Sequence, residues 1–142
     1  MSGAIKTFIE FLGVKKMCKH CYVCGNPNVE LHHICFRSQS KQLTNCVLNH
    51  VYLCPEHHRG NFGPHGKYGH ELDLKLKLEL QNKLETLFDK EYLTEDEINS
   101  VLQIGPTALK KLLKTLKRKP EGYFYLDVLR VCMGGRLYEW YY

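Results

Sequence analysis

Leucines dominate residues 71–88 and fit two different periodicities. Leucine occupies every second position from 72 to 80, as in a strand with one buried face. The segment also places leucines along one helical face, at Leu72, Leu76, Leu80, Leu84 and Leu87. The lysines, glutamates and glutamine between them favour helix, and no β-branched residue precedes Thr86. We therefore predict a helix over this segment.

The pattern that follows predicts two short helices separated by a break. Thr94 and Glu97 have the spacing of a capping box, so a helix is expected over about 95–103. An Ile-Gly-Pro sequence ends this helix, and Thr107 is expected to cap a second helix over about 107–117. Beyond a Pro-Glu-Gly turn, a last ordered element is expected before the chain reaches two consecutive glycines.

These patterns divide the chain into three parts. Residues 1–17 contain a short amphipathic helix, residues 18–90 form the central module, and residues 91–142 form a small helical module. The boundary between the last two parts is expected near 89–93. The first fifty residues of the central module have little apolar periodicity and are rich in Cys, His, Gly and Asn, so they require an internal staple.

The carboxy-terminal module has the layout of a helix-turn-helix, in which two short helices meet at an Ile-Gly turn. Apolar positions for its small core are Ile98, Leu102, Ile104, Leu109 and Leu112 or Leu113. Residues 107–119 hold six basic residues and no acid, as in a helix that follows DNA phosphates or enters the major groove. The residues expected to contact DNA are Arg59, Lys110, Lys111, Lys114, Lys117 and Arg118. A solvated basic helix packed on the rest of the chain is the alternative interpretation.

The composition is that of a folded protein without a membrane span. Of 142 residues, 44% are apolar and 25% are charged, which excludes a disordered chain. No apolar run approaches the roughly 20 residues that a transmembrane helix needs. The first residues include Glu10 and lack a small-residue cleavage site, so we expect no signal peptide and a cytoplasmic location. The net charge of +5 is compatible with a nucleic-acid partner.

Cysteine and histidine carry the candidate chemistry. Six of the seven cysteines lie between Cys18 and Cys54, and seven of the eight histidines lie between His32 and His70. An odd number of cysteines without a secretion signal argues against a disulfide framework, so the clustering indicates metal binding.

Two short motifs within the cluster have the spacing of a structural zinc site. Their ligands are Cys21, Cys24, Cys54 and His57, in a C-x-x-C and a C-x-x-H pair. Cys18 offers an overlapping knuckle with Cys21, but the glycine after Cys24 suits a tight turn and favours the second pair. The alternative is a lone knuckle with unrelated buried cysteines. The three other cysteines, in apolar surroundings, are expected to be small buried residues.

The order of these residues resembles a known family. Cys21-x-x-Cys24, Leu31-His32-His33-Ile34, Asn49 and the run from Val51 to Arg59 are similar to the HNH endonuclease motif, including that of small bacteriophage HNH proteins. The resemblance covers about residues 18–70. It implies an α+β fold with a zinc-stapled ββα-metal core, to which flanking helices and the small helical carboxy-terminal module are added.

The resemblance also implies roles for individual residues. His32 and His58 would ligate a divalent catalytic metal, His33 would be the general base, and Asn49 would orient His33 through the hairpin backbone. Members of the family often have Cys where His57 stands, so His57 and His58 could exchange roles. A third catalytic-metal ligand is expected at His65 rather than at His70, on a glycine-rich loop that could fold over the metal.

The expected function is that of a metal-dependent DNA endonuclease of a phage or prophage in a bacterial host cell. The expected cofactors are structural Zn²⁺ and a catalytic Mg²⁺, Mn²⁺, Ni²⁺ or Zn²⁺, and the expected partner is duplex or branched DNA. One alternative is a non-cleaving, zinc-stapled DNA-binding or inhibitor protein of phage origin that reuses the HNH scaffold. Another is a nuclease directed at junctions or at RNA.

Overall fold

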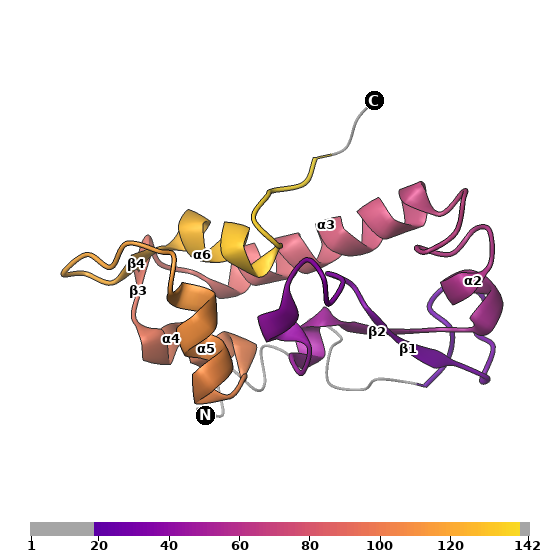
Figure 1. Cartoon of the computed structure of the whole chain (residues 1–142), viewed down its shortest axis with the longest axis horizontal. Coiled ribbons are helices and arrows are strands. Elements are labelled where there is room, and N and C mark those ends of the chain that lie inside the picture. Colours follow the sequence, from indigo (N-terminus) through magenta and orange to yellow (C-terminus); the bar gives the residue numbers. More distant parts are fainter. Residues whose placement is uncertain (1–18, 140–142) are drawn as a thin grey trace.

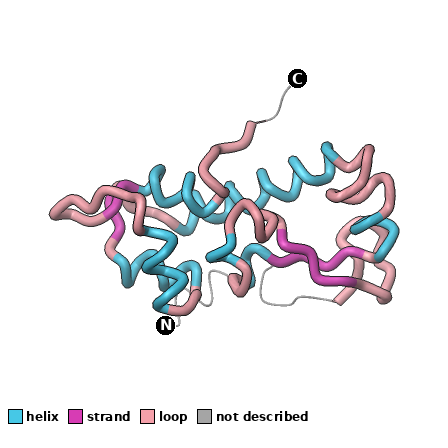
Figure 2. Tube along the Cα trace, in the orientation of Figure 1, coloured by secondary structure: helices cyan, strands magenta, loops and turns pink. Residues whose placement is uncertain are grey.

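A computed structural model describes residues 19–139 of the chain. The helix predicted within residues 1–17 and the thiol of Cys18 lie outside the described residues. Within the described residues the fold is α+β, with five α-helices and two small two-stranded sheets (Figure 2). The α+β expectation is therefore confirmed.

The first sheet is a hairpin that exposes adjacent histidines to different surroundings. Strand β1 (Glu30–His33) pairs antiparallel with β2 (His50–Leu53), in a register that places His32 opposite Val51 and His33 opposite His50. Two 3₁₀ helices, η1 (Lys41–Leu43) and η2 (Val47–Asn49), lie in the connection between the strands. Because successive side chains of a strand point to opposite faces, His32 is buried and His33 is half-buried.

Helices α2 (Pro55–Arg59) and α3 (His70–Leu87) follow the hairpin, with a glycine-rich loop between them. In Figure 1, α3 runs along much of the molecule, with the hairpin and α2 towards one end and the carboxy-terminal helices towards the other. Its buried apolar residues include Leu74, Leu76, Leu78, Leu80, Leu84 and Leu87. A helix buried on more than one side carries leucines all round, which explains why this segment also fitted the periodicity of a strand. The helix prediction is confirmed.

In the carboxy-terminal part, two helices lie in sequence between the two strands of a second sheet. Strand β3 (Tyr92–Leu93) pairs antiparallel with β4 (Tyr123–Phe124), and α4 (Glu95–Leu102) and α5 (Pro106–Leu113) lie between them in sequence. Helix α6 (Tyr125–Cys132) follows β4 directly. The predicted final element is therefore a short strand followed by a helix.

The capping box at the start of α4 is confirmed. The Thr94 hydroxyl accepts a hydrogen bond from the Glu97 amide at 3.2 Å, and the Glu97 carboxylate accepts one from the Thr94 amide at 3.1 Å. Gln103, with φ of 51°, ends the helix in the left-handed conformation.

Two expectations for α5 were wrong. Gly105 is its N-cap and Pro106 is its first residue, so Thr107 lies inside the first turn and caps nothing. The helix also ends at Leu113 instead of near residue 117, because the chain turns back to form β4. Lys114, Lys117 and Arg118 therefore follow the helix, and only Lys110 and Lys111 of the expected DNA contacts lie on it.

One continuous cluster of buried side chains holds the described residues together. It extends from Cys21 in the zinc motif, through α3, to Tyr138 near the carboxy terminus. The expected helix-turn-helix core is buried, at Ile98, Leu102, Ile104, Leu109, Leu112 and Leu113. Cys35, Cys46 and Cys132 are also buried, as predicted. None of the described helices is both long enough and apolar enough to cross a membrane.

A buried ion pair lies on α3. The Lys77 ammonium is 2.8 Å from the Asp73 carboxylate, and the exposed fraction of the Lys77 side chain is only 3%. The ammonium also lies over the ring of Phe36, 4.3 Å from its centroid, so it connects α3 to the loop that follows β1. A buried charge without its partner is costly, so removing one member of this pair should lower the stability of the fold.

We expect Asp73→Ala to lower the free energy of unfolding by about 3–5 kcal/mol, because it leaves the Lys77 ammonium buried and unpaired. The double variant Asp73→Ala with Lys77→Met should regain most of this loss, and urea denaturation measures both. The exposed pair of Asp127 and Arg130 on α6 supplies a control, since Asp127→Ala should cost less than about 1 kcal/mol. Equal losses for Asp73→Ala and Asp127→Ala would contradict the argument.

Candidate metal centres

The residues with zinc-ligand spacing come together at the base of the hairpin. The Gly25 amide donates to the Cys21 carbonyl at 2.8 Å, and Gly25 has φ of 77°. This glycine therefore closes the tight turn that carries Cys21 and Cys24. The Tyr22 amide donates to the Tyr52 carbonyl at 2.9 Å and fastens the turn to β2. Cys54 is the N-cap residue of α2 and supplies the third sulfur from the other side.

The ligand atoms have the separations of a tetrahedral site. Zn–S bonds near 2.3 Å and Zn–N bonds near 2.0 Å at tetrahedral angles require about 3.8 Å between two sulfurs and about 3.6 Å between sulfur and nitrogen. The Cys24 and Cys54 sulfurs are 3.8 Å apart, and the Cys21 sulfur is 3.7 Å from His57 Nδ1. His57 Nδ1 is somewhat closer to the Cys54 sulfur, at 3.2 Å. Three thiols and one imidazole at these distances form a zinc-type site.

The surroundings of Cys21 favour the thiolate form of its side chain. Burial raises the pKa of the Cys21 thiol, but hydrogen bonds from the backbone of Cys54, Cys24 and Val23 and from His57 outweigh this effect and lower the pKa to about 6. The thiolate is the form that binds zinc, so a thiol that is largely deprotonated at neutral pH suits a ligand.

Three histidines form a second group next to the first. The ring centroids of His32, His58 and His65 lie 5.1 to 5.2 Å apart, so the three rings form a nearly equilateral triangle. One comes from β1, one from α2 and one from the loop before α3. Each can direct a ring nitrogen to a common point, and ring nitrogens from the three lie within 4.8 Å of one another.

His32 needs a partner that no described side chain or backbone group provides. Its side chain is 1% exposed, and both of its ring nitrogens are buried without a hydrogen bond among the described residues. Burial, together with the neighbouring His58 and His65, lowers its pKa to about 3. The ring is therefore neutral, with a lone pair that costs free energy unless something binds it. A metal ion ligated together with His58 and His65 fits this requirement.

Glu30 sets the orientation of His58. The Glu30 carboxylate accepts a hydrogen bond from His58 Nδ1 at 2.9 Å, which leaves Nε2 of the same ring free for a metal. Two further hydrogen bonds, from Arg59 Nε at 2.9 Å and Nη2 at 2.6 Å, hold the carboxylate. His58 and then Arg59 keep the pKa of Glu30 below its ordinary value, so the carboxylate stays charged. Carboxylate-to-histidine hydrogen bonds of this kind typically support metal ligands.

His33 faces the other way and has a defined tautomer. Its Nε2 lies 3.0 Å from the Thr44 carbonyl oxygen, which can only accept, so Nε2 carries the proton and Nδ1 has the lone pair. His50, opposite His33 in the sheet, donates to the same carbonyl at 2.7 Å. Burial lowers the pKa of His33; the Thr44 hydrogen bond raises it, and the charges of His50 and Arg37 lower it. The result is a neutral imidazole with a free acceptor nitrogen.

Asn49 fixes the backbone around His33 without touching its ring. Fully buried, it accepts from the Cys35 amide at 2.7 Å and donates to the Cys35 carbonyl at 3.1 Å and the Leu43 carbonyl at 3.3 Å. These bonds join the end of β1 to η1, and Thr44 directly follows η1. Asn49 thereby holds the carbonyl that orients His33.

Asn49→Ala should lower the free energy of unfolding by about 2 kcal/mol or more, because it leaves the buried Cys35 amide and carbonyl without partners at about 1 kcal/mol or more each and removes one of the two hydrogen bonds to the Leu43 carbonyl. Urea denaturation measures the loss. Asn28→Ala is the matched control, since Asn28 is exposed before the same hairpin and should change stability by less than about 0.5 kcal/mol. A neutral Asn49→Ala would refute its structural role.

The histidine triangle and His33 line the same surface pocket. The pocket has a volume of about 460 Å³, and its lining includes His32, His33, His58, His65 and Arg37. The candidate metal group, the candidate base and an exposed guanidinium therefore border the same space.

The structure also separates the alternatives that the sequence left open. His57 lies with the cysteines and His58 with His32, so the two do not exchange places. His65 joins the histidine triangle, whereas His70 is exposed at the start of α3 and outside both groups. Arg59, expected to contact DNA, is paired with Glu30 instead of being free.

Sequence reasoning missed three residues of this region. Glu30 is separated from His58 by 28 residues, and only the fold brings them together. His50 directly precedes the recognised Val-Tyr-Leu run, and its place in that strand was a usable signal. Arg37 follows the double histidine by four positions, on a loop whose course the sequence did not reveal.

Comparison with family models, curated proteins and solved structures found no significant match for this chain. The assignment of the two groups therefore rests on their own chemistry. One group offers three thiols and an imidazole, and the other offers three imidazoles.

Proposed function

We propose that this chain is a metal-dependent endonuclease of the HNH type, which hydrolyses phosphodiester bonds in DNA. The observation that supports this best is the arrangement around His32. Its buried ring, which has no hydrogen-bond partner within residues 19–139, lies in a triangle with His58 and His65, at the same pocket as the oriented and neutral ring of His33. A metal group beside a proton acceptor, in an open pocket, is the equipment of metal-assisted hydrolysis.

His33 would act as the general base. Its Nε2–H is engaged by the Thr44 carbonyl, so Nδ1 is the atom that would accept a proton from the attacking water. Burial keeps the pKa of this ring below its ordinary value, so the acceptor form predominates at neutral pH. Asn49 would serve this step indirectly, by fixing the loop that carries Thr44.

His32, His58 and His65 would hold the divalent ion. When bound, such an ion stabilises the negative charge that develops on the phosphate and on the leaving oxygen. Glu30 would keep His58 Nε2 directed to that ion, and Arg37 at the pocket would donate hydrogen bonds to a phosphate oxygen. Imidazole ligands accept Mn²⁺, Ni²⁺ and Zn²⁺ readily, and Mg²⁺ is the harder alternative.

Zinc held by the cysteine group would serve as the scaffold for this site. Helix α2 carries a ligand of each group, His57 and then His58, in consecutive positions. Fixing α2 through Cys54 and His57 would therefore also fix His58 relative to β1. The stability of the first centre then determines the geometry of the second.

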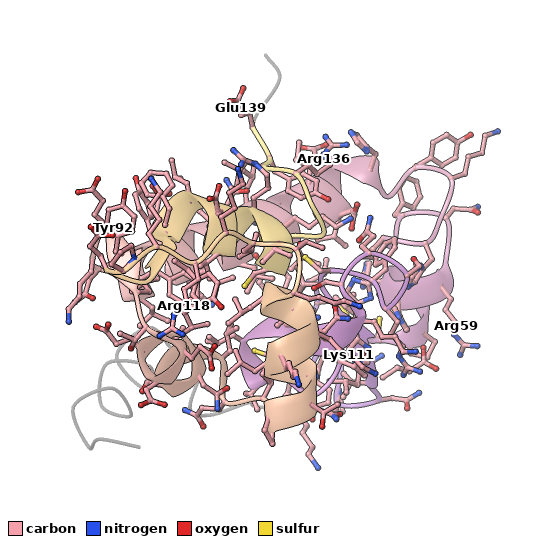
Figure 3. All side chains as sticks on the ribbon, turned by 60° about the vertical axis from the view of Figure 1, so that its left-hand side comes forward. Arg59, Tyr92, Lys111, Arg118, Arg136 and Glu139 are labelled. Carbon is pink, nitrogen blue, oxygen red and sulfur yellow. The ribbon has the colours of Figure 1, made fainter. Side chains whose placement is uncertain are left out.

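Basic residues of the carboxy-terminal part would help to hold the DNA. Lys110 and Lys111 are exposed on α5, and Lys114 and Arg118 follow it. Figure 3 shows Lys111 on α5 and Arg118 on the segment beyond, well apart from Arg59 on α2. Such charges would bind phosphates without reading sequence.

The test is nicking of supercoiled plasmid by zinc-loaded protein with added Mg²⁺, Mn²⁺ or Ni²⁺. We expect nicking by the unaltered chain and a loss of at least about 10- to 100-fold for His65→Ala, because metal sites lose this much even when a supporting residue is removed. His65 is exposed, so its removal should leave the fold intact. His70→Ala is the matched control and should behave like the unaltered chain. Absence of cleavage of both plasmid and single-stranded DNA with every metal would refute the proposal and favour a non-cleaving DNA-binding protein.

A further inference from the structure

The loop between α2 and α3 is packed tightly against itself. Glycines recur at every third position from 60 to 69, and amides of the later glycines donate to carbonyls three residues earlier, as from Gly66 to Gly63 at 2.8 Å. A Cβ at Gly66 would lie 2.0 Å from the Gly60 carbonyl oxygen, and one at Gly69 would lie 1.5 Å from that of Gly63. Backbone therefore fills the inside of this loop, and its larger side chains have to project outwards.

Two aromatic side chains project from this loop into solvent. Phe62 is 65% exposed and Tyr68 is 57% exposed, the largest exposed fractions of any large apolar side chains among the described residues. The Tyr68 amide donates to the Asn61 carbonyl at 2.6 Å, which closes the loop and brings the two rings together. Their centroids are 5.6 Å apart with 31° between the planes, so they form one apolar surface. Rings this exposed contribute little to the core.

The pair shares its loop with one residue of the histidine triangle. His65, of the histidine triangle, lies on the same closed loop, three residues from each ring in sequence. The Lys67 ammonium lies 5.3 Å from the centroid of the Tyr68 ring and adds a positive charge beside the aromatic surface. Exposed rings next to a cation are the elements with which proteins bind bases and phosphates of single strands.

We infer that Phe62 and Tyr68 form a stacking platform for an unpaired nucleobase, so that the chain acts on single-stranded or locally opened nucleic acid. In a regular duplex the faces of the bases are covered by their neighbours, and only an unpaired base can lie on such a surface. This inference rests on the proposed nuclease function and specifies its substrate class. A base held there would lie on the same loop as His65 of the histidine triangle.

The test measures binding of a single-stranded oligonucleotide that contains 2-aminopurine, whose fluorescence is quenched by stacking, to full-length His33→Ala protein. We expect quenching, and we expect the added change Phe62→Ala with Tyr68→Ala to weaken single-strand binding about 10- to 100-fold. Binding of the matching duplex should change by less than about threefold, because it depends on phosphates. The pair Phe62→Tyr with Tyr68→Phe keeps both rings and should bind like the parent, as should Val47→Ala, which alters an exposed apolar residue on η2.

Unchanged single-strand binding by the double alanine variant would overturn the platform, and so would an equal loss for strand and duplex. A fall in its melting temperature of more than a few degrees would also overturn it, because the rings would then be packing elements. The two proposals fail separately. Stacking without cleavage of any substrate would refute the nuclease and leave the platform, and plasmid nicking with unaltered binding by the double variant would do the reverse.

Discussion

Cys24→Ala is expected to abolish zinc binding and to unfold the part of the chain that carries the histidine triangle. Structural zinc contributes about 10–16 kcal/mol of apparent binding free energy in zinc-finger peptides, whereas a whole domain is stable by about 5–15 kcal/mol. The hairpin sheet has only two strands of four residues each, and the helix that carries His58 has Cys54 as its N-cap and contains His57. Metal analysis should find one zinc in the unaltered chain, or two if the histidine triangle is also loaded, and none in the variant. Circular dichroism should report the loss of structure.

Cys46→Ala is the matched control for this experiment. Cys24 is exposed, so its removal costs almost no packing, whereas Cys46 is 1% exposed and lies outside both metal groups. If packing alone mattered, Cys46→Ala would be the more damaging change. We expect the reverse: Cys46→Ala should keep its zinc and lose only about 1 kcal/mol, as for a buried methyl-sized group. A zinc-free but folded Cys24→Ala protein would show that the staple is dispensable.

His33→Ala should reduce the rate of phosphodiester cleavage by about 100- to 10,000-fold, the contribution of a positioned general base. The variant should keep its fold and its metals, because His33 lies in neither metal group. The rate constant under saturating metal and substrate is the measurement, with metal content determined in parallel. Added imidazole should restore part of the activity, since a small base can occupy the space that the side chain leaves.

His50→Ala separates a catalytic role of His33 from a structural one. His50 is also a half-buried histidine that donates to the Thr44 carbonyl, but it is absent from the lining of the pocket. If the hydrogen bond to Thr44 were the only contribution, both variants would lose the same activity. We expect His50→Ala to cost no more than a few-fold, and equal losses would argue against His33 as the base.

Helix α2 connects the cysteine group to the histidine triangle. His57 lies with the cysteines and His58 with the triangle, although they are neighbours in the chain. Consecutive residues of an α-helix point about 100° apart, so one short helix can serve two centres on different sides. We therefore expect a disturbance of the cysteine group to reach the triangle through His58 and through Glu30, which binds both His58 and Arg59.

Local rules were sufficient for several parts of this protein. A knuckle depends on a turn of four residues, so C-x-x-C spacing followed by glycine already identified Cys21 and Cys24. The capping box at Thr94 and Glu97 likewise involves only neighbouring residues, and the sequence predicted it correctly. The helix at α3 was predicted from composition, because its two-sided burial had blurred the periodicity.

Only the tertiary structure decided which histidine belongs to which group, how far α5 extends, and what orients the rings. His57 and His58 are chemically identical, and their assignment depends on how α2 packs against β1, which no local pattern encodes. Helix α5 stops at Leu113 because the chain must return to pair β4 with β3, and the intrinsic helix preference of the following lysines gives no sign of this. Glu30 and Thr44 act on histidines 28 and 11 residues away, across contacts that exist only once the hairpin and α2 have come together.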